Sequence, residues 1–419
     1  MNAPLLSQNA IVDGNNLLSL TEACRRAAGF VSAVCECEVI DVLSAIGRTL
    51  AKPVFAQLMQ PRFDQSAMDG YAVASISTSG GNVALLVSGR ITAGQRPTPL
   101  APGTALRIFT GAPLPPGADA VVMQEHVLRR GDEILIPATV EVGANIRRQG
   151  EDIQTHTRLL EPGTRLDARH TALLSAQGID RVAVLRRIKI AVISTGNELR
   201  EPGATLSDGA IFDSNRRMLL ALAAEAGFET IDGGWLPDDK EYMTTHLRRL
   251  SSEVDFIVSS GGASVGDEDH AASAAIAAGG TIETLKIAMK PGKPALVGRI
   301  ARAAFLGLPG NPIAALVAWL NLGGAMAAAL NGRAPKPLFG CPMPTTTMFE
   351  RRSGRTEFVP ARLTEGPNGQ ALEILGRGGS ARLRPLVEAD GLAEISAEHG
   401  TVQPGHVLIF HPFHGGFTF

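Results

Sequence analysis

The stretch IKIAVISTGNE, residues 188–198, joins a continuous apolar run to a polar loop that contains glycine. Such a run predicts a strand that is buried on both faces of a sheet. Further apolar runs lie at 230–236, 255–260, 285–289, 295–297 and 303–308. Helical patterns lie among them or after them, at 215–227, 239–250, 270–278 and from Pro312 onward. The alternation predicts an α/β domain over 186–333 with a mostly parallel sheet.

The rest of the sequence predicts further domains, so that the whole chain is a multidomain α/β plus β protein. Short apolar runs bounded by Gly and Pro predict a β-rich insert over 53–149. The segments on either side of it, 15–52 and 150–185, carry helical patterns, and we expect these to pack together as one discontinuous helical domain. β signals return after Gly340 and predict a small C-terminal β domain over 338–419.

Composition excludes several classes of protein. The chain has 39 Lys plus Arg against 41 Asp plus Glu, and this balance argues against nucleic-acid binding, which needs a basic excess. Four cysteines without zinc-ligand spacing indicate free thiols in a reducing compartment. The N-terminus has no signal-peptide pattern, and we interpret the apolar segment 313–330 as a buried helix because it contains Asn321 and a Gly pair. We expect a cytoplasmic protein without a membrane partner.

Three loops at the expected strand ends share small hydroxyl residues and glycines. Such loops let backbone N–H groups approach an anion closely, and the hydroxyls add donors. Each loop alone is typical of an ordinary turn, but three at one sheet edge indicate an anionic ligand. The candidate binding residues in these loops are Ser194, Thr195, Gly196, Ser260, Gly261, Gly262, Ser264, Gly266, Pro309, Gly310, Asn311 and Pro312.

Charged residues of both signs accompany these loops. Lys286, Lys290 and Lys293 lie in LKIAMKPGKP, and their charges suit a phosphate or another oxyanion, although a solvated basic turn explains this segment equally well. Carboxylates beside an anion indicate a bridging Mg²⁺, which binds one or two of them, while helix capping is an alternative role for some. The acidic residues near the strand ends are Glu198, Asp238, Asp239, Asp267 and Asp269.

Seven motifs, in this order along the chain, resemble the MoeA family. They are SAMDGYAV, RIFTGAPLPPGADAVVMQE, IRRQGEDI, STGNEL, SSGGASVG, AMKPGKP and LPGNP. The first three lie in segments whose composition alone indicates only turns. The MoeA proteins are molybdopterin molybdenumtransferases and are related to the C-terminal part of gephyrin. The resemblance implies four parts: a discontinuous helical domain, a β insert, a MogA-like α/β domain and a C-terminal β-barrel-like domain.

The resemblance also implies an activity and a site. Adenylylated molybdopterin and molybdate react to give molybdenum-bound molybdopterin and AMP, with Mg²⁺ as the cofactor. The implied catalytic residues are Asp69, Thr110, Asp152, Glu198, Asp238 and Asp269, and the implied metal ligands are Glu198, Asp238 and Asp269. The implied partners are a second copy of the chain, whose β insert faces the α/β domain of the first, and the molybdopterin adenylyltransferase that supplies the substrate.

Some alternatives stay open at this point. The C-terminal domain matches the family loosely, through GRTEF and residues 378–383, so the roles of Arg355 and Ser380 are undecided. An adenylyltransferase of the MogA type would share the α/β domain, but it would consume ATP instead of releasing AMP with molybdate. A non-catalytic scaffold is a third hypothesis. The sequence shows no long Pro/Ser-rich linker, and this argues against a scaffold.

Overall fold

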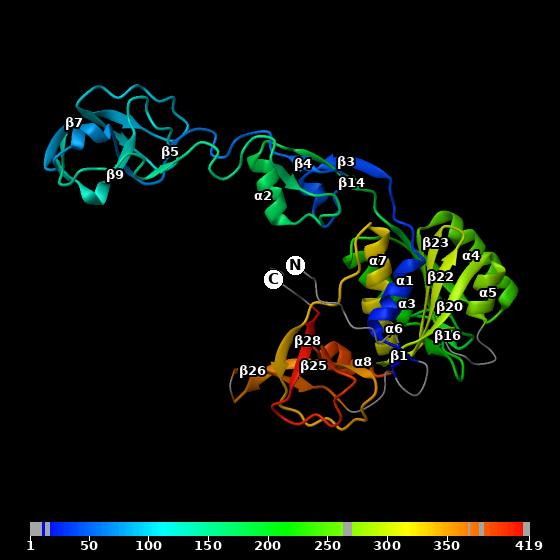
Figure 1. The fold of residues 1–419 in the computed structure, drawn as a ribbon. Helices are drawn as coiled ribbons and strands as arrows, with labels where there is room; N and C mark the ends of the chain where they lie inside the picture. Colours follow the sequence, from blue (N-terminus) through cyan, green and yellow to red (C-terminus); the bar gives the residue numbers. More distant parts are fainter. Residues whose placement is uncertain (1–10, 13–16, 263–269, 368, 377–380, 414–419) are drawn as a thin grey trace. The chain divides into compact units, whose positions relative to one another are not determined.

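The chain forms two compact units, each described here by itself (Figure 1). Unit 1 comprises residues 1–38, 47–49 and 184–419, and unit 2 comprises 39–46 and 50–183. The boundaries fall within or beside β3 (Cys37–Asp41) and β14 (Arg181–Leu185). The structure, a computed structural model, describes residues 11–12, 17–262, 270–367, 369–376 and 381–413. Five residues named above lie outside this part of the chain: Ser264, Gly266, Asp267, Asp269 and Ser380.

A six-stranded sheet in the order β18-β15-β19-β23-β22-β20 forms the centre of unit 1. The first four strands are parallel, as expected, whereas β22 is antiparallel to both of its neighbours. The connections to β22 are short, and a parallel pair would need a crossover of a dozen or more residues. The strands are β18 (Glu229–Leu236), β15 (Lys189–Thr195), β19 (Phe256–Ser260), β23 (Ala303–Leu308), β22 (Pro294–Ile300) and β20 (Gly280–Lys286).

Helices cover both faces of this sheet, which explains why its central strands are continuously apolar (Figure 1). In β15, Ile190 and Val192 belong to one core cluster, whereas Ala191 and Ile193 belong to the other. The first face is covered by α1 (Leu20–Gly29), α3 (Asn215–Glu225), α6 (Pro312–Ala318), the π-helical turn η4 (Trp319–Gly323) and α7 (Gly324–Leu330). The second face is covered by α4 (Lys240–Glu253) and α5 (Ala271–Ala277).

Helix α1 packs against the core of unit 1, and the two helices that were expected to form one discontinuous helical domain belong to different units. Ala23 and Ala27, one turn apart, are fully buried in the core of unit 1, where α1 contacts α7. The other helix, α2 (Ala168–Ala176), lies in unit 2 and begins at the capping box of Asp167. The helix expected before residue 50 is instead β3 and a short 3-10 turn, η1 (Leu43–Ala45), because β-branched residues such as Val39 favour a strand.

The segment Pro312–Leu330 is long and apolar enough to span a membrane by composition. In the structure, 67% of the 18-residue apolar stretch within this segment is buried inside the protein. Its Trp319 ring stacks on Phe256 of β19, with ring centroids 6.1 Å apart. Packing in the core therefore accounts for the apolar composition of this segment.

Unit 2 is built on a second sheet, in the order β10-β11-β7-β8-β6-β9. Two small core clusters lie on its two faces, and one of them contains Tyr71 and Ile134. The strands are β6 (Gly70–Val73), β7 (Val83–Ile91), β8 (Thr104–Ile108), β9 (Ala120–Met123), β10 (Leu128–Arg130) and β11 (Glu133–Ile136). Short ladders pair β4 (Val54–Phe55) with β13 (Arg158–Leu160) and β5 (Gln65–Ser66) with β12 (Ile146–Arg147), and η2 (Ser75–Thr78) and η3 (Gln124–His126) are 3-10 turns.

The C-terminal domain belongs to unit 1 and is a mainly antiparallel sheet in the order β25-β27-β28-β24. Strand β26 pairs with residues 361–366 of β25, and a short strand of the α/β domain, β21 (Met289–Lys290), pairs with residues 356–357 of β25. The elements are β24 (Cys341–Pro344), β25 (Thr356–Gly366), β26 (Gly369–Ile374), α8 (Leu383–Glu388), β27 (Gly391–Ile395) and β28 (Val407–Pro412). At the N-terminus, β1 (Ile11–Val12) pairs with β2 (Leu17–Leu18).

His411 joins β28 to two other parts of the C-terminal domain. Its Nε2 lies 2.8 Å from Oε2 of Glu394, and its Nδ1 lies 2.8 Å from the carbonyl oxygen of Phe339. Burial lowers the pKa of His411, but the hydrogen bonds to Glu394 and Phe339 outweigh burial and leave the pKa above its ordinary value of 6.5. The charged imidazolium is therefore the better-stabilised form in the folded chain.

We expect the stability that His411 contributes to depend on pH. A group whose pKa is higher in the folded than in the unfolded state stabilises the fold fully at pH values below its unfolded-state pKa. This stabilisation is lost as the pH rises through the folded-state pKa. The Tm difference between the wild type and His411→Gln should therefore be largest at about pH 5.5 and smallest near about pH 8. Thermal unfolding followed by circular dichroism would measure it, and a difference that grows with rising pH would contradict the assignment.

Candidate functional site

Three parallel strands end at the same edge of the unit 1 sheet. The register pairs Ser194 of β15 with Ser260 of β19, and Ser260 with Leu308 of β23. The Gly261 N–H donates to the carbonyl oxygen of Leu308 at 3.1 Å, which ties two of the following loops together. The glycine-containing loops therefore begin side by side, at the edge where parallel sheets bind ligands.

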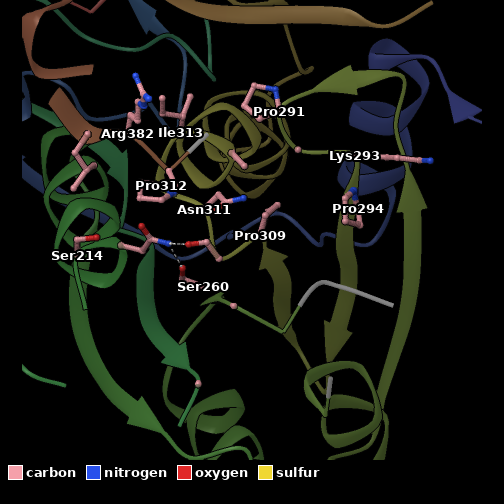
Figure 2. Close-up of a pocket in the computed structure, with 18 of the residues that line it drawn as sticks. Ser214, Ser260, Pro291, Lys293, Pro294, Pro309, Asn311, Pro312, Ile313 and Arg382 are labelled. Atoms are coloured by element: carbon pink, nitrogen blue, oxygen red, sulfur yellow. Dashed lines mark hydrogen bonds between the residues drawn. The ribbon is translucent and has the colours of Figure 1, made fainter. Parts of the chain in front are cut away.

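These loops form one wall of a cavity of about 1180 Å³ (Figure 2). Ser260, Pro309, Asn311 and Pro312 lie on this wall, and Arg382 reaches the cavity from the C-terminal domain (Figure 2). Strand β25 contributes further lining residues from that domain. The volume slightly exceeds the usual range for small-molecule sites, so the cavity can hold a ligand as large as a dinucleotide.

Two side chains hold the loops in place. Asn215, at the start of α3, donates through Nδ2 to Ser260 Oγ at 2.9 Å and to the Gly310 carbonyl oxygen at 2.7 Å (Figure 2). Trp235 of β18 donates through Nε1 to the carbonyl oxygen of Gly196 at 2.6 Å. The loop backbone is therefore positioned by the protein itself, which lowers the entropy lost when a ligand binds.

The structure brings most of the expected binding residues to this one cavity. The expected residues that line it are Thr195, Gly196, Glu198, Asp238, Ser260, Gly261, Gly262, Lys290, Lys293, Pro309, Gly310, Asn311 and Pro312. Lys286 is exposed on β20 and is not among the lining residues that the structure describes. Ser264, Gly266 and Asp269 lie outside the described residues, and Asp69, Thr110 and Asp152 belong to unit 2.

Ser194 was expected to bind a ligand, but it is not among the described residues that line the cavity. The residue is fully buried, and its Oγ donates to the carboxylate of Asp213. Asp213 also accepts from Arg216 Nε at 2.9 Å, and the buried Arg216 pairs further with Glu201 and Asp232. Ser194 thus helps to orient Asp213, which does line the cavity.

Two of the three expected metal ligands line the cavity. The Glu198 carboxylate folds over Gly196, since a Cβ atom on that glycine would lie 2.5 Å from Glu198 Oε2. Asp238 accepts the Asn197 N–H through Oδ2 at 3.0 Å. Among the described residues no group of three His, Cys, Asp or Glu could hold a metal, and Asp269 lies outside them. Because Mg²⁺ binds one or two carboxylates and completes its shell with water and phosphate oxygens, this pair fits the ion.

Cationic side chains from two domains also reach the cavity. Lys290 ends β21, Lys293 lies just before β22, and Arg355 and Arg382 come from the C-terminal domain. The Lys290 Nζ lies 2.8 Å from Oε1 of Glu357, and about half of the lysine side chain is exposed. The cavity therefore carries charges of both signs, as a polyanion with a divalent cation would require.

Asp69 and Thr110 form a preorganised pair within unit 2. Asp69 Oδ1 accepts both the backbone N–H and the hydroxyl of Thr110, each at 2.8 Å. The bond from the Thr110 backbone N–H has the largest effect, and together with the bond from the hydroxyl it holds the pKa of Asp69 below its usual value. The third expected residue, Asp152, is exposed and donates its backbone N–H to the carbonyl oxygen of Gln60 at 3.0 Å.

Sequence reasoning missed two parts of the cavity wall. The first is Asp213-Ser214-Asn215, of which only Asn215 was noted from the sequence, as the first residue of an expected helix. The polar residues before the apolar helix were a signal that could have indicated a binding loop. Their position at the cavity, however, depends on the pairing of β16 (Leu199–Arg200) with β17 (Ile211–Phe212). The second part is the C-terminal wall with Glu357 and Arg382. Both lie in the two segments through which this domain resembles the family, GRTEF and 378–383, but neither residue was named as a candidate.

Models of known families match three successive parts of the chain. The MoeA N-terminal region (domain I and II) matches residues 18–178, and the MoeA C-terminal region (domain IV) matches 342–413. A molybdopterin molybdenumtransferase of Haemophilus influenzae is 35% identical over 381 residues, which cover 90% of this chain and 94% of that protein. The chain belongs to the MoeA family.

Other relatives extend this match. A molybdopterin molybdenumtransferase of Nostoc is 39% identical over 288 residues, which cover 67% of this chain and 66% of the Nostoc protein. A crystal structure of a MoeA protein from Pyrococcus horikoshii has a TM-score of 0.75 at 32% identity, covering 96% of this chain and 100% of that one. A second structure from the same organism has a TM-score of 0.79 at 26% identity. The middle family model, a probable molybdopterin binding domain, matches 191–328, which contains the sheet-edge loops.

We expect Gly261→Ala to destabilise this MoeA-family chain. Gly261 has a φ of +91°, and a Cβ there would lie 2.5 Å from the backbone oxygen of Thr195. Strain in this conformation and the backbone clash should together lower the free energy of unfolding by about 1–3 kcal/mol. Denaturant unfolding measures this change.

Gly310→Ala is a matched control on the same wall. A Cβ at Gly310 would meet nothing within 4 Å, and its φ lies outside the left-handed region. Its free energy of unfolding should stay within about 0.5 kcal/mol of the wild type. An equal loss of unfolding free energy in the two variants would show that the close approach to Thr195 is not the reason why residue 261 has to be glycine.

Proposed function

We propose that this MoeA-family chain is a molybdopterin molybdenumtransferase of molybdenum cofactor biosynthesis. It converts adenylylated molybdopterin and molybdate to molybdenum-bound molybdopterin and AMP. The observation that carries the proposal is the convergence of three glycine-containing loops, two carboxylates and several cations on one cavity. The names of the relatives and the match to a probable molybdopterin binding domain support it.

The sheet-edge loops suit the phosphoanhydride of the nucleotide. Their backbone N–H groups and the hydroxyls of Thr195 and Ser260 supply donors in a fixed arrangement. Cleavage of a phosphoanhydride needs positioning and charge stabilisation more than covalent help from the protein. The loops would therefore orient the scissile link and stabilise the charge that AMP carries as it leaves.

The charged residues of the cavity supply the remaining requirements. Glu198 and Asp238, together with Asp269, would hold Mg²⁺, and the bound ion would polarise the phosphate oxygens. Lys290 and Lys293 would neutralise the negative charge of the phosphates or of the incoming molybdate. We place molybdate near these lysines because a tetrahedral oxyanion is bound by compact cations.

The remaining partners follow from the resemblance to the family. We propose a homodimer in which the β-rich insert of one chain faces the α/β domain of the other. The preorganised pair of Asp69 and Thr110 supports this arrangement, because a paired carboxylate and hydroxyl can position a ligand that a second chain holds. We also propose a cytoplasmic location and contact with the molybdopterin adenylyltransferase that makes the substrate.

Anaerobic incubation with adenylylated molybdopterin, Mg²⁺ and molybdate tests the function. We expect AMP release that depends on molybdate, measured by liquid chromatography. Adenylylation of molybdopterin with consumption of ATP would instead support the adenylyltransferase hypothesis. Binding of partner proteins without AMP release under any of these conditions would support the scaffold hypothesis.

Loss of either cavity carboxylate should slow the reaction. We expect Glu198→Gln and Asp238→Asn each to lower kcat by about tenfold or more, or about 1.4 kcal/mol, because one ligand of the cation is lost. Both variants should also need more Mg²⁺ for half-maximal activity. Steady-state AMP release against Mg²⁺ concentration measures the two effects.

The neighbouring acid provides the control for this series. Asp239 caps α4 by accepting the Tyr242 N–H at 2.8 Å and is not among the cavity-lining residues that the structure describes. Asparagine caps a helix about as well as aspartate, so Asp239→Asn should retain both kcat and the Mg²⁺ requirement. A loss in Asp239→Asn as large as in Asp238→Asn would refute a specific role for Asp238.

A further inference from the structure

Glu357 is a buried acid on the cavity wall that lies between two cations. It belongs to β25, and only 6% of its side chain is exposed. Its Oε1 lies 2.8 Å from Lys290 Nζ, and its Oε2 lies 3.0 Å from Arg351 Nε. A carboxylate buried this deeply has to be paired, because an unpaired charge would be strongly destabilising.

Arg351 fixes Glu357 from the side of the C-terminal domain. Its side chain is 2% exposed, and Nη1 donates to the carbonyl oxygens of Ser396 and His399 at 2.8 and 2.7 Å. Its Nη2 donates to the carbonyl oxygen of Arg355. Each guanidinium nitrogen is therefore engaged within the domain, so Arg351 anchors the carboxylate and does not turn to a ligand.

Lys290 is the most exposed member of this group. Its side chain is 52% exposed and lines the cavity. An ammonium group has three donors, so Lys290 can bind Glu357 and an anion at the same time. The parallel pairing of β21 with β25 sets Lys290 opposite Glu357, so the backbone itself brings the ion pair together.

We infer that Glu357 is a positioning residue that holds the Lys290 ammonium at the cavity, where it meets the oxyanion substrate. This inference rests on the proposed function. It adds that a residue of the C-terminal domain controls how tightly the α/β domain binds the oxyanion. As a negative charge alone, Glu357 would oppose anion binding. Positioning and charge repulsion therefore predict opposite effects for Glu357→Gln: the first weakens molybdate binding and the second strengthens it.

A double-mutant cycle on the full chain tests the inference, with inorganic molybdate as the probe and calorimetry as the readout. We expect Glu357→Gln and Lys290→Ala each to raise the Kd of molybdate about tenfold. The double variant should bind no more weakly than Lys290→Ala, because Glu357 acts through that lysine.

Lys293→Ala is the matched control. Lys293 lines the same cavity, and no ion pair with Glu357 is found among the described residues. The fold-increase in Kd of the double variant should therefore equal the product of the fold-increases that Lys293→Ala and Glu357→Gln cause separately. Glu357→Asp serves as a second variant if Glu357→Gln fails to fold, since it keeps the charge that Arg351 needs but shortens the reach to Lys290.

The outcomes separate the inference from the proposed function. A wild-type chain that releases AMP on molybdate addition, with tighter molybdate binding in Glu357→Gln, overturns the inference alone. A loss in Glu357→Gln that persists in the Lys290→Ala background also overturns it, because the residue would then act through the fold. A wild-type chain that neither binds molybdate nor releases AMP overturns both.

Discussion

The parallel register of β15, β19 and β23 is the constraint on which the site depends. The strands are buried on both faces, so a slip of one residue would turn the side chains of Ile190 and Val192 to the wrong core. The fixed register places Ser194, Ser260 and Leu308 side by side at or next to the ends of these strands. The packing of the core thereby determines where the backbone of three loops faces one cavity.

The C-terminal domain is part of this site rather than an appendage. It supplies one wall of the cavity, and β21 and β25 pair across the boundary between the two domains. The Lys290–Glu357 ion pair sits at this pairing, with the buried Arg351 behind it. A substrate with several negative charges would therefore contact residues from both domains, and the affinity of each part would depend on the other.

The sequence predicted the parts of the structure whose signals are local. The apolar strands of the α/β domain, its helices and most of the sheet-edge loop residues were found, because burial on both faces leaves a continuous apolar pattern. The helical pattern in VIDVLSAIGRTL, residues 39–50, was misleading, because short β-branched segments fit either a strand or a helix by spacing alone. The packing partner of α1 could not be predicted, because small residues such as Ala23 and Ala27 do not specify which helix they contact.

Trp235 and Trp319 are the only tryptophans in the 419-residue chain. Trp319 is buried in the core beside Phe256, whereas Trp235 is 36% exposed and bonded to the loop carbonyl of Gly196. The emission of one indole therefore reports on the interior and that of the other on the ligand-facing loop. The protein thus carries two intrinsic optical reporters, one sensitive to loss of the fold and one to occupancy of the sheet edge.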